Sequence, residues 1–195
     1  MNTKLANVIM AGVATLLSLI GAIVYCFYHY KNGWVIADKW ILFVICGILT
    51  GLAVVSMISD SLPEILYVIP LGCLAVMSVI DFIRVIVQAV QDDYGVSSVL
   101  SGMVSILLTI ALCVGMILTE VKADMNPLFG ICPLAYYIID YTFLSVSAFF
   151  SIFSSLGSEY SKNSATMYSA AWLADLAWIL FFLVYALRLK NKKEA

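Results

Sequence analysis

Residues 40–59 read WILFVICGILTGLAVVSMIS and contain no charged side chain. A helix needs about 20 predominantly apolar residues to cross the hydrocarbon core of a bilayer, and this stretch is long enough to do so. Within a bilayer the backbone must satisfy its own hydrogen bonds, which favours an α-helix. The stretch therefore predicts a transmembrane helix.

Five further stretches have similar length and composition. With the first, they predict six spans at about residues 5–28, 40–59, 63–88, 97–119, 133–156 and 167–188. Polar, glycine-containing segments separate most of them, as is typical of loops. The connection 125–133 is unusually apolar, which favours a loop at the membrane interface or one that dips into the protein. The prediction is an all-α, polytopic membrane protein, a bundle of six transmembrane helices without a soluble domain.

Composition supports a lipid environment. Hydrophobic residues make up 64% of the 195 residues and charged residues 11%, whereas soluble domains have about 45–50% and about 25%. Too little polar surface remains to cover a water-soluble fold. The net charge of −2 and the dispersed basic residues give no indication of nucleic-acid binding.

Basic residues outside the spans set the orientation, because cytoplasmic loops carry an excess of Lys and Arg. With six spans both termini lie on one side. That side collects Lys4, Lys122, Arg188, Lys190, Lys192 and Lys193, against Lys31, Lys39 and Lys162 on the other. The sequence thus predicts a cell-membrane protein with cytoplasmic N- and C-termini. The final residues 192–195, KKEA, also resemble a dilysine retrieval signal of the endoplasmic reticulum, and a basic tail obeying the charge rule explains them equally well.

Small residues recur at helical spacing inside the spans, which indicates close packing of helices in lipid. The stripes are Ala14, Ser18 and Ala22; Gly47 and Gly51; Ser97, Ser101, Ser105, Thr109 and Cys113; and Ser147, Ser151 and Ser155. They favour packing within the bundle or against other membrane subunits. A loose similarity between residues 11–24 and 101–114 suggests a degenerate 3+3 inverted repeat.

Catalytic signatures are missing from the sequence. There is no nucleophile elbow, zinc-protease motif, phosphate loop or dinucleotide fingerprint. The five cysteines are well separated and show no metal-ligand spacing. The sequence therefore predicts neither an enzyme nor a metal site or cofactor. In the span 63–88, Pro70 is expected to kink the helix.

Ionisable residues inside the predicted spans are the strongest functional signal, since each charge costs about 2.5–3.5 kcal/mol near the bilayer centre. They are Asp81 and Arg84 in the third span, Asp140 in the fifth and Asp175 in the sixth. Asp81 and Arg84 are one turn apart, which suits an ion pair. Tyr168, Trp172 and Asp175 share a face of the last span.

Two functions fit these residues. The first is a solute-binding or transport subunit with an outward-facing cavity, in which aromatic walls and carboxylates hold a small molecule or cation. Its ligand site would comprise Asp81, Arg84, Tyr168, Trp172 and Asp175, with Asp140 on the inner half as an ion or proton relay. The second is an accessory subunit that packs against a larger membrane complex. A purely structural role, in which the charges fix helix register, competes with both.

Overall fold

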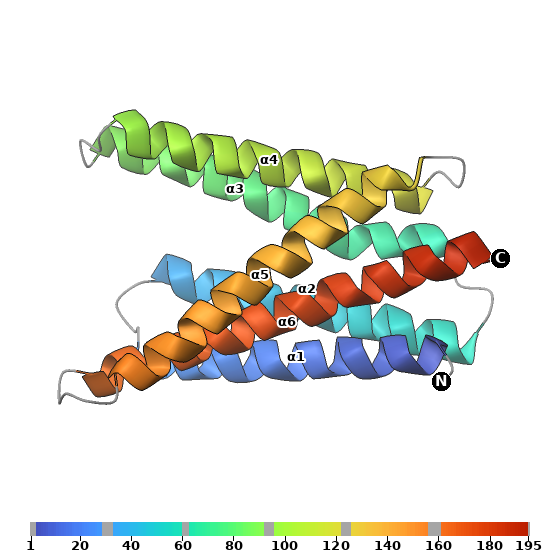
Figure 1. Ribbon diagram of the computed structural model, residues 1–195, viewed down its shortest axis with the longest axis horizontal. Coiled ribbons are helices and arrows are strands. Elements are labelled where there is room, and N and C mark those ends of the chain that lie inside the picture. The colour runs from blue at the N-terminus through green and yellow to red at the C-terminus, as the bar shows by residue number, and fades with distance from the viewer. Residues whose placement is uncertain are drawn as a thin grey trace. The chain divides into compact units, whose positions relative to one another are not determined.

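A computed structural model of the protein describes residues 3–28, 33–59, 63–91, 96–121, 126–155 and 161–194. These residues are almost entirely helical, so the predicted all-α fold with six helices is confirmed (Figure 1). The elements are α1 (Thr3–Tyr28), α2 (Gly33–Ile58), the 3-10 helix η1 (Glu64–Tyr67), α3 (Val68–Gln91), α4 (Val96–Val121), α5 (Leu128–Ser155) and α6 (Ser161–Glu194).

Five helical stretches are long and apolar enough to cross a membrane. They are Thr3–Cys26, Ala37–Ile58, Glu64–Val87, Leu128–Ser155 and Ser164–Lys190. In α4 the apolar stretch found among the described residues is shorter, Ile106–Val121. Five of the six predicted spans thus meet the length and composition that a bilayer requires.

The start of α5 differs from the prediction. The segment 125–133 was predicted to be a connection between spans, but its residues from Leu128 onward belong to α5. The Leu128 amide donates a hydrogen bond to Asn126 Oδ1 at 3.0 Å, and the Phe129 amide donates to the Asn126 carbonyl oxygen at 3.0 Å. Asparagine capping followed by proline is a strong helix start. The apolar residues after Pro127 therefore belong to the helix.

Pro70 lies near the start of α3, which begins at Val68 directly after the 3-10 helix η1. The change that the structure shows near this proline is the passage from 3-10 to α-helix between Tyr67 and Val68. The kink expected at Pro70 stays a prediction.

The chain divides into two compact units. The first unit contains α1, α2, α6 and the part of α5 from Leu134 onward, and the second contains η1, α3, α4 and the start of α5 up to Pro133. In the first unit α1 and α6 run antiparallel, with the two chain ends at the same end of the pair (Figure 1). In the second unit α3 and α4 form an antiparallel hairpin.

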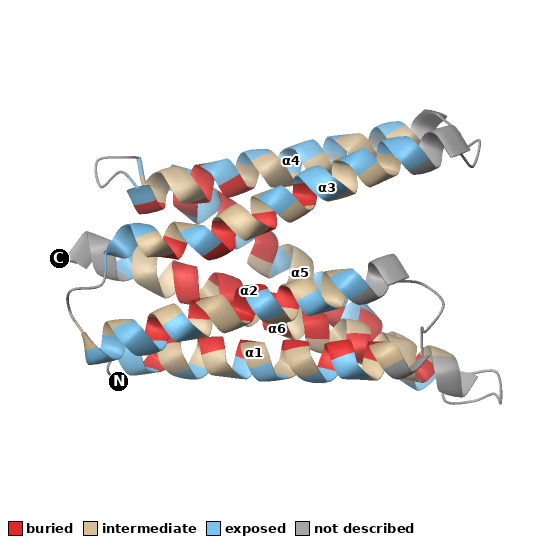
Figure 2. Cartoon of the chain, turned by 180° about the vertical axis from the view of Figure 1, so that it is seen from behind, coloured by how far each residue is buried: buried red, intermediate tan, exposed pale blue. Residues whose placement is uncertain are grey.

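Small side chains hold α1, α2 and α6 together. Buried residues gather where these three helices face one another, and exposed residues lie on their outer sides (Figure 2). The predicted stripe Ala14, Ser18 and Ala22 is buried, at 0%, 2% and 1% exposure. A Cβ placed on Gly21 would lie 3.3 Å from the carbonyl oxygen of Ala170 in α6. The two backbones therefore approach as closely as small residues permit.

Two other predicted stripes of small residues do not mediate close packing of helices. No described atom lies within 4 Å of a Cβ placed on Gly47 or Gly51, so this glycine pair makes no close helix contact. On α5, Ser147 is exposed and its carbonyl oxygen accepts a 2.8 Å hydrogen bond from the Ser151 hydroxyl. Serines of a helix can satisfy their hydroxyls on their own backbone, so spacing alone does not imply packing.

The second unit has its own close contact. A Cβ on Gly115 of α4 would lie only 2.8 Å from the carbonyl oxygen of Phe129 at the start of α5. Cys113 and Met116, on the same part of α4, are buried. Since Phe129 contributes backbone atoms rather than a flexible side chain, the contact requires a residue without a side chain at position 115.

Candidate functional site

Aromatic rings form the contact between α5 and α6 in the first unit. Tyr137 of α5 stacks on Phe182 of α6, with ring centroids 4.5 Å apart and planes at 4°. Tyr141, one turn further along α5, lies 6.0 Å from Phe182 and 5.6 Å from Trp178, with interplanar angles of 20° and 21°. The four rings are thus nearly parallel and alternate between the helices. We call Tyr137, Tyr141, Trp178 and Phe182 the aromatic stack.

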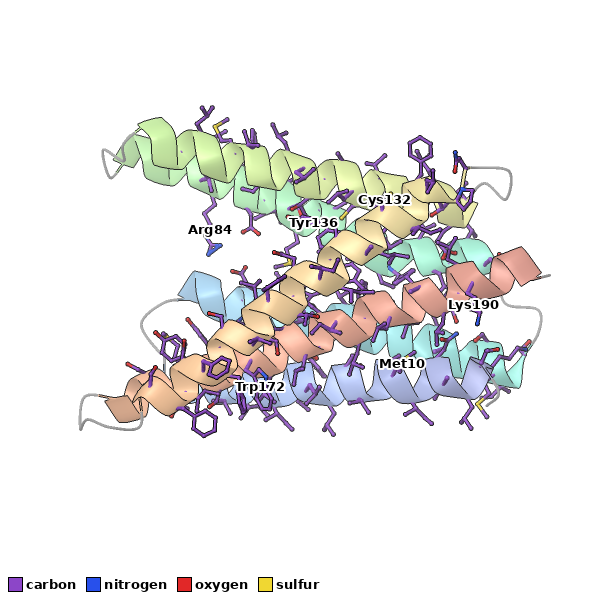
Figure 3. The ribbon with its side chains drawn as sticks, in the orientation of Figure 1. Met10, Arg84, Cys132, Tyr136, Trp172 and Lys190 are labelled. Atoms are coloured by element: carbon purple, nitrogen blue, oxygen red, sulfur yellow. The ribbon has the colours of Figure 1, made fainter. Side chains whose placement is uncertain are left out.

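The aromatic stack continues as looser ring contacts in both directions along α6. Phe181 lies at 5.1 Å and 90° to Phe182, and at 5.2 Å from Tyr185. Toward the other end, Trp172 lies 5.7 Å from Phe149 of α5 at a tilted angle. Trp172 lies in the first half of α6 and Lys190 near its C-terminal end (Figure 3). Of the predicted face of α6, the Trp172 ring thus contacts α5.

Two acidic residues lie close to the aromatic stack in the sequence of α5 and α6. Asp140 precedes Tyr141 on α5, and Asp175 lies one turn before Trp178 on α6. Both side chains are half-buried. Asp175 interacts electrostatically with Lys39 of α2, which attracts the carboxylate, and with Asp140, which repels it. We call Lys39, Asp140 and Asp175 the charge cluster.

Lys39 also lies near the ring of Tyr25 in α1. Its Nζ lies 6.0 Å from the centroid of the Tyr25 ring of α1, at the outer limit of a cation–π contact. Asp38, the preceding residue, also attracts the ammonium. The adjacent Trp40 donates a hydrogen bond from Nε1 to the Sγ of Cys26 at 3.2 Å, which fastens the start of the α2 span to α1.

Sequence reasoning missed Lys39. The prediction began the second span near residue 40 and assigned Lys39 to an external connection, whereas α2 begins at Gly33 and its apolar stretch at Ala37. A lysine stem is long enough to lie along apolar surface while its ammonium reaches a polar partner. The only signal in the sequence was a lysine directly before a long apolar run, which is equally typical of an interfacial residue.

The structure divides the five predicted ligand residues between the two units. Asp81 and Arg84 lie on α3 in the second unit, where Arg84 Nη1 and Asp81 Oδ1 are 3.1 Å apart. Their predicted ion pair is confirmed, with side chains 34% and 24% exposed, respectively. The Arg84 side chain extends away from the axis of α3 (Figure 3).

The remaining three predicted residues lie together on α6 in the first unit. Tyr168, Trp172 and Asp175 are all half-buried, and successive members are about one turn apart. Their union with Asp81 and Arg84 in one site stays a prediction. Asp140, assigned by sequence to a different depth from Asp175, interacts electrostatically with it.

The formal charges of the three members of the charge cluster, +1, −1 and −1, sum to −1. Such an arrangement suits a cation with an apolar or aromatic body. In the described part of the chain no three His, Cys, Asp or Glu side chains are placed to hold a metal ion together. Compared with known proteins, the chain matches no family model, no curated protein and no solved structure.

Proposed function

We propose that the protein is a multi-pass protein of the cell membrane with six spans and cytoplasmic termini, and that it binds and carries a small organic cation. The five long apolar helices support the membrane assignment. The sixth span is α4, which is 26 residues long as a helix. The excess of basic residues on the side of the termini supports the orientation.

The observation that carries the proposal is the charge cluster beside the aromatic stack. Asp140 and Asp175 lie within the apolar stretches of α5 and α6, where an unbalanced carboxylate costs about 2.5–3.5 kcal/mol near the bilayer centre. A purely structural cluster would be expected to balance its charges, because leaving one buried charge unpaired is strongly destabilising. A bound cation would remove the excess negative charge, and Tyr141 and Trp178 offer ring faces to its organic part.

Binding can be tested with the purified protein in lipid nanodiscs. Phenethylamine is titrated while tryptophan fluorescence is followed, because Trp172 and Trp178 lie on the same helix as Asp175. Phenethyl alcohol and phenylacetate serve as neutral and anionic analogues. We expect saturable binding of the amine alone, abolished by Asp175→Asn and kept by Glu64→Gln, which removes an exposed carboxylate of η1. Equal responses to all three compounds would contradict the proposal.

Topology requires a separate experiment. In a variant without its native cysteines, single cysteines are introduced at Tyr94 and Ser161 and treated with a membrane-impermeant thiol reagent. Both positions lie in segments that the proposed orientation places outside the cell, so intact cells should be labelled. Labelling only after permeabilisation would show that these segments face the cytoplasm and would contradict the proposed orientation.

A second function, that of an assembly subunit, is favoured by one specific feature of α5. Its outward side exposes Phe143, Phe150 and Phe153 at 73%, 66% and 58%. Lipid can cover such a surface, and so can another membrane protein. Photo-crosslinking from position 150 in native membranes distinguishes the two functions. A discrete protein adduct favours the assembly subunit. Lipid adducts alone favour the solute-binding protein.

A further inference from the structure

The helix α5 belongs to both compact units. Its first residues, from Leu128 to Pro133, lie in the second unit, and its residues from Leu134 onward lie in the first unit. Pro133 lies inside the helix. Proline has no amide hydrogen, so the carbonyl oxygen of Phe129, four residues earlier, does not receive the hydrogen bond that a regular helix would give it. The change from one unit to the other therefore coincides with the position at which α5 lacks a backbone hydrogen bond.

The helix turn before this position contacts the backbone of α4. A Cβ on Gly115 would lie 2.8 Å from the Phe129 carbonyl oxygen and 3.5 Å from Pro133 Cγ. In glycine a Cα hydrogen takes the direction of that Cβ, so a Cα–H group of α4 lies against the carbonyl that Pro133 deprives of its donor. Such a C–H group is a weak hydrogen-bond donor. Gly115 thus partly replaces the missing amide and holds the turn Leu128–Pro133 against α4.

The helix after this position is held by a different kind of contact, within the first unit. Tyr137, one turn beyond Pro133, stacks on Phe182 of α6 with ring centroids 4.5 Å apart. Tyr141 lies nearly parallel to Trp178, with centroids 5.6 Å apart. The two parts of α5 therefore have separate attachments, to α4 before the proline and to α6 after it.

We propose that Pro133 is a hinge of α5, about which the two units move relative to one another as rigid bodies. The turn Leu128–Pro133 stays with α4 during this movement, and the helix from Leu134 onward stays with α6. A hinge is typically formed by a few residues that absorb a change of backbone angles while the bodies on either side keep their own packing. Proline is a common cause of bending inside a helix, because the bond that would resist bending is missing.

The hinge goes beyond the proposed function, and its test needs no ligand. Transporters commonly expose a site to each side of the membrane in turn by rocking one group of helices against another. A hinge in α5 gives a solute carrier a movement of that kind. The aromatic stack lies entirely in the first unit, so its rings stay in contact while the units move.

Distances between pairs of spin labels, measured by electron paramagnetic resonance in lipid nanodiscs, test the hinge. In a variant without its native cysteines, one pair joins the two units, at Val104 of α4 and Phe150 of α5. Two pairs stay within one unit, Ile69 with Val104 and Leu16 with Phe150. All four side chains are exposed. We expect a broad or two-component distance distribution for the pair that joins the units, and narrow distributions for the other two pairs.

A substitution then places the movement at Pro133. Pro133→Ala restores an amide that can donate to the Phe129 carbonyl, and it should narrow the distribution of the joining pair to the width found within the units. Pro133→Val, which also has an amide and is closer to proline in size, takes its place if the alanine variant does not fold. Pro63→Ala is the matched control, because Pro63 lies where the chain also passes between the units and has an extended backbone before η1. It should leave the distribution broad.

Two results would overturn the proposal. Three narrow distributions in the natural sequence would mean that the units do not move relative to one another. A joining pair that stays broad when residue 133 has an amide, or that narrows in Pro63→Ala instead, would mean that the movement does not occur at Pro133.

Discussion

The helix α6 uses two different kinds of contact in the first unit. Toward α1 it presents Ala170, Ala174 and Ala177, all buried, and the carbonyl oxygen of Ala170 lies 3.3 Å from the place of a Cβ on Gly21. Toward α5 it presents the large rings of Trp178 and Phe182. In lipid there is little hydrophobic force between helices, so packing must come from contact itself. Small residues achieve it by bringing backbones together, and rings achieve it across a wider gap.

The difference has a functional consequence. An interface of alanines and glycines leaves no space for a solute, and its side chains offer no recognition. An interface of stacked rings keeps two helices apart and offers π faces. The α1–α6 contact is thus made by backbones and small side chains, and the α5–α6 contact by rings.

The largest expected effect concerns the aromatic stack. Phe182 is 0% exposed and contacts Tyr137, Tyr141, Trp178 and Phe181. Phe182→Ala should lower the free energy of unfolding in mild detergent by about 3–5 kcal/mol, because the cavity lies among rings that cannot all close it. Phe182→Leu, which keeps most of the volume, should cost clearly less. Equal small losses would mean that α5 is held by something other than the stack.

The next effect concerns the close contact between α1 and α6. Gly21→Leu should destabilise the protein by about 1–3 kcal/mol, since the new side chain meets the backbone of Ala170 and the side chain of Leu173. Gly12→Leu on the same helix is the matched control, because no described atom lies within 4 Å of its Cβ position. Thermal unfolding of both variants checks the prediction. A similar loss at the two glycines would show that helix propensity, rather than contact with α6, decides the outcome.

The smallest expected effect concerns the ion pair within α3. It serves as a comparison with the charge cluster, whose members lie on different helices. Asp81 and Arg84 pair at 3.1 Å on α3 and are both partly exposed. Both residues lie close to the end of the apolar stretch Glu64–Val87, which the proposed topology places near the membrane surface. Their coupling in a double-mutant cycle of Asp81→Asn and Arg84→Gln should therefore be about 0.5 kcal/mol. Stability measurements on the three variants provide the value. A coupling of several kcal/mol would place this pair in the apolar interior of the bilayer.

The sequence identified some parts of the candidate site and not others. Asp81 and Arg84 were recognised as an ion pair because residues three apart on a helix are neighbours whatever surrounds the helix. Asp175 and Trp172 were recognised as members of one face for the same reason. Asp140 and Lys39 were not connected to Asp175, because their proximity depends on how three helices are rotated and how deeply each is set. Tyr137 and Tyr141 gave no signal, since tyrosine is common in apolar helices at membrane interfaces.

What the sequence by itself determined is the number of helices, their apolar character and the contacts made within a single helix. These follow from backbone hydrogen bonding and from local spacing, which act over a few residues. Only the tertiary structure decided which apolar residues face other helices. It buries the stripe of Ala14 and Ser18, whereas Gly47 and Gly51 make no close contact. The physical reason is that a residue facing lipid and a residue facing another helix are both apolar, so hydropathy does not distinguish them.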